Sequence, residues 1–252
     1  NRRWYKKYYR TLIKSKRIQL SSNSIRGIQD YSKWLGISKK KILLTENLTY
    51  EKTSKITKKE ARTQLAHELK IESSLENAFI LGGLFRLEHQ KQPHLFIETL
   101  KSLSSNFEFL LGVIIGDGIL YGEASLLIKK HGLDKNVFLL GQRDNVNDYL
   151  PAFDILLHTA LHEGFPNSLC EAQLNSIPVV ALDSGDISKI IDHNRSGFVV
   201  KKYNPKSLPT FCAKLLMNRS LGNKFGAKGN EIQRNRIFEK QSEKQIWNLY
   251  QI

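Results

Sequence analysis

Apolar runs and amphipathic stretches alternate along the chain from residue 78 onward. Six apolar runs have the length and aliphatic content of buried parallel strands: 78–85, 107–115, 136–141, 154–160, 178–184 and 197–200. Between and after them lie stretches in which apolar residues recur at helical spacing: 93–105, 118–132, 146–153, 168–177 and 205–251. Strands that alternate with helices predict an α/β fold, a Rossmann-like parallel sheet with right-handed crossovers.

The first 57 residues follow a different pattern. A basic stretch opens the chain and places Trp4, Tyr8 and Leu12 on one helical face. A short apolar strand, a helix with a Ser or Asn cap that ends at Gly36, and a strand at 41–47 are predicted next. A polar linker then leads into a helix at about residues 58–70. We therefore expect three parts: 1–57, a main domain at 58–235, and a closing helix at 236–252.

Positive charge is concentrated at the start of the chain. Residues 1–70 hold 19 of the 39 lysines and arginines but only 5 of the 24 acidic residues, so most of the net charge of +15 lies there. A basic amphipathic stretch can lie against an anionic membrane, or it can be a solvated helix packed on a neighbour. No nucleic-acid-binding signature accompanies it, so nucleic acid is not an expected partner.

Composition further limits the class of protein that this chain can be. No apolar run reaches 18 residues and no secretory signal pattern is present, so we expect a cytoplasmic protein. Cys170 and Cys212 lie far apart without metal-ligand spacing and are expected to be free thiols. The histidines lack the pairing typical of zinc sites, so no metal is expected.

The loop that follows the strand at 154–160 carries the strongest chemical signal. It contains Glu163, Gly164, Phe165, Pro166 and Asn167 and leads into a helix from Ser168. Strand, loop, helix and strand form a βαβ unit, whose loop lies on the edge where open α/β sheets bind ligands.

The residue types in this loop suit a binding site for an anion next to a sugar. Gly164 permits close backbone approach, Pro166 stiffens the turn, and Asn167 or Ser168 can cap a helix whose free amides favour phosphate. A carboxylate would be repelled by phosphate, so Glu163 and Glu171 are better suited to accept hydrogen bonds from sugar hydroxyls. The loop alone is explained equally well as an ordinary turn with solvated glutamates.

The segment EGFPNSLCEAQLNSIPVV, residues 163–180, resembles the signature of glycosyltransferase family 4, retaining enzymes of the GT-B fold. That signature has E-G-F, a second Glu eight positions on, then Ala, a small residue and Pro-Val-Val. Asn175 and Ser176 stand where the family commonly has Ala or Gly.

Arg86 and Lys91 follow the strand at 78–85, on the same expected sheet edge. Alone they are typical surface charges, although Arg and Lys together can neutralise a diphosphate. In family 4 the equivalent strand is followed by Gly-Arg-Leu and a Lys five residues later, which hold the donor's phosphates. Leu84 and Phe85 separate Arg86 from the preceding glycines, which makes the match of Arg86 less close.

Two further features match the family more weakly, and two histidines lie beside the signature loop. Arg143 follows the strand at 136–141, where the family seats the nucleobase, and is a candidate contact. His158 and His162 flank the signature loop and are expected to be core or rim residues. The final helix at 236–252 resembles the family's closing helix, which crosses back to the amino-terminal domain.

The resemblance implies a retaining transfer of a sugar from a UDP- or GDP-sugar, without a cofactor, to a glycan or lipid-linked acceptor. Arg86, Lys91 and the amides of 164–167 would hold the diphosphate. Glu163 would hold the transferred sugar and Glu171 the ribose. The implied setting is bacterial surface-polysaccharide synthesis, with the basic stretch at residues 1–17 on the inner membrane face.

Part of the machinery is expected outside this chain. GT-B enzymes place the active site between two domains, and 1–57 corresponds only to the end of the first, so the chain is expected to bind donor and to be inactive alone. Two alternatives share the fold: a nucleotide-sugar epimerase and a non-catalytic nucleotide-sugar-binding relative. The glutamate pair in the E-G-F-P context favours the transferase over the epimerase, and retention of Glu163 and Lys91 argues against the non-catalytic relative.

Overall fold

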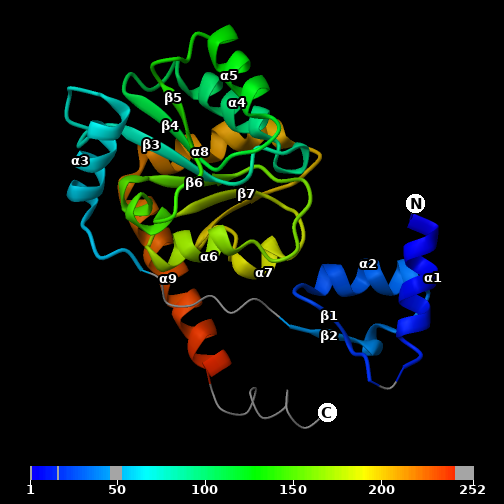
Figure 1. Cartoon of the computed structure of the whole chain (residues 1–252). Helices are drawn as coiled ribbons and strands as arrows, with labels where there is room; N and C mark the ends of the chain where they lie inside the picture. Colours follow the sequence, from blue (N-terminus) through cyan, green and yellow to red (C-terminus); the bar gives the residue numbers. More distant parts are fainter. Residues whose placement is uncertain (1, 16, 46–52, 242–252) are drawn as a thin grey trace.

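The computed structural model describes residues 2–15, 17–45 and 53–241, and residues 2–45 of this set are called the amino-terminal unit (Figure 1). This unit consists of two helices, a parallel strand pair and a short turn: α1 (Arg2–Leu12), β1 (Leu20–Ser22), α2 (Ile25–Leu35), η1 (Lys39–Lys41) and β2 (Ile42–Leu44). Ser24 caps α2 by accepting from the Gly27 amide, and Gly36 ends it at φ 66°. The predicted cap and stop are therefore confirmed.

Helix α1 packs on α2 through both polar and aromatic contacts. The Arg10 Nε donates to the Leu35 carbonyl at 2.7 Å, and the Tyr9 and Trp34 rings lie 6.0 Å apart. On another side of α1, Trp4 is 62% exposed and Tyr8 is 49% exposed. The predicted basic amphipathic helix is present, with part of its aromatic face open to solvent.

The rest of the chain is built around a parallel sheet of six strands in the order β5-β4-β3-β6-β7-β8. The strands are β3 (Phe79–Leu84), β4 (Leu110–Ile115), β5 (Val137–Gly141), β6 (Ile155–His158), β7 (Val179–Leu182) and β8 (Gly197–Val200). The chain builds outward from β3 to β5 and then returns to place β6 beside β3. The carboxyl ends of β3 and β6 therefore form a topological switch point, where such sheets bind ligands.

Helices cover both faces of this sheet, as Figure 1 shows. The helices are α3 (Lys58–Leu69), α4 (Pro93–Leu103), α5 (Tyr121–Lys130), α6 (Asn167–Leu174), α7 (Ile187–Ile190), α8 (Leu208–Met217) and α9 (Arg219–Gln241). Short 3-10 turns connect them: η2 (His89–Lys91), η3 (Val146–Asp148), η4 (Leu150–Ala152) and η5 (Pro205–Ser207). The stretch 146–153, predicted as one short helix, is thus two 3-10 turns, since Pro151 cannot donate a helical hydrogen bond.

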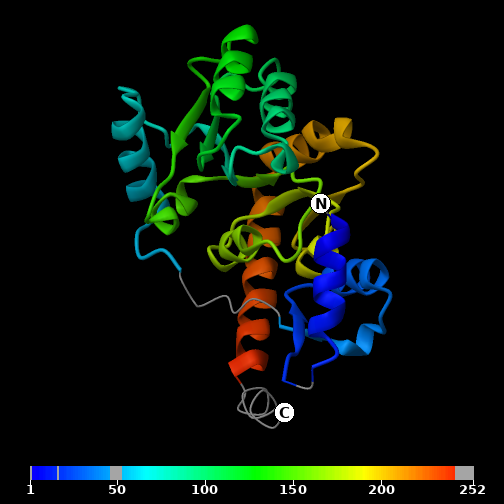
Figure 2. The ribbon, with the colours of Figure 1, turned by 45° about the vertical axis from the view of Figure 1, so that its right-hand side comes forward.

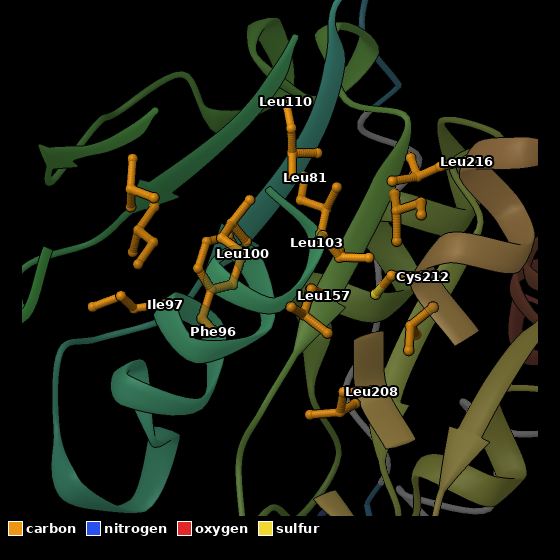
Figure 3. Close-up of a cluster of buried hydrophobic side chains, with 14 of the residues drawn as sticks. Leu81, Phe96, Ile97, Leu100, Leu103, Leu110, Leu157, Leu208, Cys212 and Leu216 are labelled. Atoms are coloured by element: carbon orange, nitrogen blue, oxygen red, sulfur yellow. The ribbon is translucent and has the colours of Figure 1, made fainter. Parts of the chain in front are cut away.

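Two apolar clusters pack against the two faces of the sheet. Leu81 of β3 lies with α4, α5 and α8 in one cluster, part of which Figure 3 shows, while its neighbour Ile80 lies with α3, α6 and α7 in the other. This alternation is the period-two pattern of a strand that is buried on both sides.

Helix α9 holds α6 in place through a buried polar network. The Gln233 side-chain amide donates to Gln173 Oε1 at 2.7 Å, and Gln173 donates to the Ser196 hydroxyl at 3.1 Å. Figure 2 shows α9 as a long helix that extends past the sheet. The expected division between residues 235 and 236 falls inside this helix, which is continuous to Gln241.

Two glycines of α9 allow a matched stability test. A Cβ atom at Gly226 would lie 1.9 Å from the Ser176 carbonyl oxygen, whereas one at Gly222 would meet nothing closer than 3.8 Å. We expect Gly226→Ala to lower the free energy of unfolding by about 1–3 kcal/mol through overpacking. Gly222→Ala should raise it by up to about 1 kcal/mol, because Ala favours the helix. Urea denaturation measures both, and equal effects would contradict the close α6–α9 packing.

Candidate functional site

Segments that follow β3 and β6 are joined side by side at the switch point. Lys91 ends η2, after β3, and Glu163 lies in the loop after β6. The Thr159 hydroxyl donates to the Lys91 carbonyl at 2.8 Å, and the Leu161 amide donates to the Gln90 carbonyl at 2.9 Å. These bonds place the two predicted site residues within reach of each other.

A compact charged cluster results. The Lys91 ammonium donates to Glu163 Oε1, and the His158 Nε2 lies 3.1 Å from the same oxygen, close in distance but out of line for a hydrogen bond. The side chains of Lys91, Glu163 and His158 are only 15%, 10% and 2% exposed. Charged and polar groups this poorly hydrated need close partners, so the three side chains depend on one another.

The cluster keeps Glu163 ionised. Burial by itself would raise the pKa of Glu163, but the adjacent His158 ring and the Lys91 ammonium outweigh that effect and hold this pKa below its ordinary value. At neutral pH the site therefore presents a carboxylate that can accept hydrogen bonds.

A tight backbone crossing fixes the loop that carries Glu163. Gly185 has φ 59°, and a Cβ atom there would lie 2.1 Å from the Glu163 carbonyl oxygen. The next residue, Asp186, donates its amide to the Gly164 carbonyl at 3.1 Å. Since a side chain at position 185 would strain the backbone and collide with the loop, glycine is required there.

The amino-terminal unit holds the same region from the other side. The Asp186 carboxylate accepts from the amides of Ile25 at 2.6 Å and Arg26 at 3.2 Å, at the start of α2. A Cβ atom on Gly164 would lie 2.8 Å from Asn23 Oδ1. A buried carboxylate on free helix amides is a strong contact, so α2 is anchored next to the site loop.

The helix after the loop differs from expectation at its start. Asn167 or Ser168 was predicted as the cap, but α6 begins at Asn167, and its N-cap is Pro166, which makes no side-chain cap hydrogen bond. That prediction is wrong because Asn167 is already the first residue of the helix and not the residue before it. Phe165 is buried beneath the Arg236 guanidinium, 5.3 Å from the ring centre.

Gly164 and Glu171 are both half-buried, Gly164 in the loop and Glu171 in the second turn of α6. Asn175 and Ser176 close α6, and Ser176 adopts φ 58°, a left-handed conformation that glycine takes more readily. The family commonly has Ala or Gly at these positions.

Arg86 lies apart from the cluster, at the start of the connection from β3 to α4. Its side chain is 67% exposed and pairs with Glu88 at 2.9 Å. The backbone beneath it rests on a glycine turn, since a Cβ atom at Gly116 would lie 2.1 Å from the Phe85 carbonyl oxygen. Of the two predicted cations, only Lys91 contacts Glu163 in the described residues.

Arg143 belongs to a separate polar group that is centred on Glu68 of α3. Its guanidinium pairs with Glu68, whose other oxygen accepts from the Tyr149 hydroxyl at 2.8 Å. The hydrogen bond with Glu68 raises the pKa of Arg143, so the charge is firmly held. Its role as a nucleobase contact stays a prediction.

Among the residues that the structure describes, no three His, Cys, Asp or Glu side chains gather as metal ligands. Within the same ranges no helix is long and apolar enough to cross a membrane. Both cysteines are buried thiols outside any disulfide, and burial raises the pKa of the Cys212 thiol.

Two residues were missed or undervalued from the sequence. His158 was expected to be an ordinary core or rim residue, although its place at the end of β6 put it on the ligand-binding edge. Asp186 was not singled out, because its partners in α2 lie about 160 residues away. The first could have been found from its strand position, but no local signal identified the second.

Replacing Glu163 with Gln tests the cluster. The amide keeps the shape but leaves Lys91 without its anion, so we expect a loss of about 1.5–3 kcal/mol in the free energy of unfolding near neutral pH. Because folding lowers the pKa of Glu163 from 4.5, the gap between wild type and variant should shrink as pH falls below that value and through the lowered pKa.

Urea denaturation from about pH 7 to about pH 3 measures this gap. Glu108→Gln, at an exposed carboxylate, is the matched control. A gap for Glu163→Gln that stays constant over this range would show that the carboxylate is not stabilised by its neighbours.

Known glycosyltransferases are similar to this chain in sequence. The chain is 28% identical over 168 residues to a poly(ribitol-phosphate) alpha-N-acetylglucosaminyltransferase of Staphylococcus aureus, covering 66% of this chain and 33% of that protein. It is 28% identical over 128 residues to a UDP-Gal:alpha-D-GlcNAc-diphosphoundecaprenol alpha-1,3-galactosyltransferase of Escherichia coli, covering 50% and 33%. The chain thus spans about a third of the length of these relatives.

Solved structures show the same fold. HepE of Anabaena, in complex with UDP and glucose, superposes with a TM-score of 0.80 at 20% identity over 93% of this chain and 63% of that one. TarM of S. aureus gives 0.73 at 21% identity over 95% and 44%. The predicted α/β, Rossmann-like sheet of GT-B type is confirmed. The family profile described as "Glycosyl transferases group 1" matches residues 40–232, more than half of the chain, and the chain belongs to that family.

Proposed function

We propose that this chain supplies the donor site of a glycosyltransferase that moves a sugar from a nucleotide-diphosphate sugar to a glycan or lipid-linked acceptor. The observation that carries the proposal is the cluster of Lys91, Glu163 and His158 at the switch point of the sheet. The resemblance of residues 163–180 to the family 4 signature supports a retaining reaction.

The diphosphate binds between Lys91 and the start of α6. Pro166, the N-cap of α6, makes no side-chain cap hydrogen bond, and the helix dipole favours an anion at this end. Lys91 supplies a compact positive charge that neutralises the leaving group as the sugar departs.

Arg86 adds a second positive charge from the surface. Its exposed pair with Glu88 contributes little energy, so the guanidinium can exchange Glu88 for a phosphate oxygen. Arg143 contacts the nucleobase side of the donor from a position that Glu68 holds fixed.

Glu163 accepts hydrogen bonds from the transferred sugar, and Glu171 accepts them from the ribose. When Lys91 turns toward the phosphate, the Glu163 carboxylate is released to bind hydroxyls in the same poorly hydrated site. Such preorganised charge is worth most where water is excluded. Gly164, Phe165, Pro166 and Asn167 shape the loop around these groups.

The names of the relatives guide the choice of donor and acceptor. The S. aureus relative is named for poly(ribitol-phosphate), the E. coli relative for a sugar on diphosphoundecaprenol, and one HepE structure contains UDP-glucose. We propose a UDP- or GDP-sugar donor, no cofactor or metal, and an acceptor of bacterial surface-polysaccharide synthesis on the cytoplasmic side. Transfer requires the part of the relatives that this chain does not span.

Helix α1 is proposed to rest on the inner membrane face. Trp4 and Tyr8 stack with ring centres 5.6 Å apart and are largely exposed, and basic residues share the helix with them. Exposed aromatic rings beside basic side chains suit the boundary of an anionic bilayer.

Calorimetry with UDP, GDP and their sugars tests the donor site. Lys91→Ala and Glu171→Ala should each weaken donor binding about 10- to 150-fold, which corresponds to the roughly 1.5–3 kcal/mol of a charged hydrogen bond. Lys101→Ala, an exposed lysine of α4, is the control and should leave binding unchanged. Unchanged affinity in both site variants would refute the assignment.

Vesicle flotation tests the membrane contact. Each basic residue near an anionic surface contributes about 1 kcal/mol, so Lys6→Glu with Lys7→Glu should weaken binding to anionic vesicles at least about tenfold. Binding should also fall with added salt and be absent from neutral vesicles. Lys129→Glu with Lys130→Glu makes the same charge change on α5, and an equal effect there would show only a general charge attraction.

A further inference from the structure

A hollow of about 690 Å³ lies between the amino-terminal unit and the site loop. Its lining residues come from α1, α2 and the loop: Tyr5, Tyr9, Asp30, Tyr31, Trp34 and His162. His162 directly precedes Glu163, so one wall of the hollow belongs to the same loop as the proposed sugar-binding carboxylate.

The aromatic rings of this hollow are held in a fixed arrangement. Trp34 packs edge-on against Tyr9 at 6.0 Å and 69°, and against Tyr31 at 6.0 Å and 75°. Tyr31 is 49% exposed and Tyr5 is 55% exposed, so much of this aromatic surface is open to a ligand. Edge-to-face packing of this kind fixes the ring orientations.

The hollow is also fixed relative to the donor site. Helix α2 provides Asp30, Tyr31 and Trp34, and its amino end is bound by the buried Asp186 carboxylate. The residue before Asp186 is Gly185, which touches the Glu163 backbone. The lining on α2 and the Glu163 loop are therefore tied to one support.

We propose that this hollow binds a neutral sugar ring of the acceptor. This inference rests on the proposed function. A pyranose ring has an apolar C–H face that packs on aromatic rings and an edge of hydroxyls that needs hydrogen-bond acceptors. The hollow offers both, with Asp30 and His162 beside its aromatic walls, in the size range of ligand sites.

Charge distinguishes this hollow from the donor site. Its lining contains the Asp30 carboxylate, which pairs with Arg26 at 3.3 Å, and no Lys or Arg, so it offers no cation to a diphosphate and suits an uncharged saccharide. The exposed Trp4 and Tyr8 pair lies outside this lining, so sugar binding and membrane contact use separate parts of α1.

Saturation-transfer NMR with methyl glycosides of glucose, galactose and N-acetylglucosamine tests the proposal on the full chain. At least one glycoside should bind, and Trp34→Ala and Tyr31→Ala should each weaken it by about tenfold. Tyr203→Ala, at a tyrosine that is 87% exposed, is the control and should change nothing. Circular dichroism checks folding, and Tyr31→Ala, at a half-exposed ring, keeps the contact between Trp34 and Tyr9.

UDP affinity is measured for every variant, which separates the two proposals. Weakened glycoside binding with unchanged UDP binding supports the hollow as a sugar site. Glycoside binding that survives both substitutions, or binding of none of the glycosides by a chain that binds UDP, overturns it and leaves the donor site standing. A wild-type chain that binds neither UDP nor GDP overturns the proposed function itself.

Discussion

The ion pair between Lys91 and Glu163 is the contact on which the rest of the site depends. It joins side chains 72 residues apart, at the ends of two neighbouring strands, in a place where little water remains. Removing such charges from water costs several kcal/mol per ion, and the cost is recovered only if both partners are held closely. The bonds from Thr159 and Leu161 and the crossing at Gly185 supply that restraint.

The same restraint connects the amino-terminal unit to the ion pair of Lys91 and Glu163. Asp186 binds the free amides of α2 directly after Gly185 has passed the Glu163 backbone, so one short segment supports both the site loop and α2. From the other direction, α9 reaches the loop through Arg236 on Phe165. The site loop is thus held by η2, by the segment of Gly185 and Asp186, and by α9. These three supports explain how a loop can present a charged cluster in a single arrangement.

The sequence was most informative where the signal is local. All six strands of the main sheet followed from their apolar runs, and the cap at Ser24 and stop at Gly36 from residue type. Lys91 and Glu163 were identified by resemblance to a family, but their direct contact depends on strand order, which is a property of the whole sheet. Asp186 and Arg143 also have partners far away in sequence, at separations of 161 and 75 residues. The start of α6 was misplaced by a single residue, enough to turn an expected cap into the first helical residue.

The central claim is that donor binding divides this pair, with Lys91 going to phosphate and Glu163 to sugar. The most direct measurement compares the affinity of wild type and Glu163→Gln for a nucleoside diphosphate and for its matching nucleotide sugar. The account predicts that the variant binds the diphosphate as well as wild type, or more tightly, because a negative charge near phosphate is gone, but loses the added affinity that the sugar provides. An equal loss for both ligands would contradict it, since Glu163 would then serve the site only as a structural partner of Lys91.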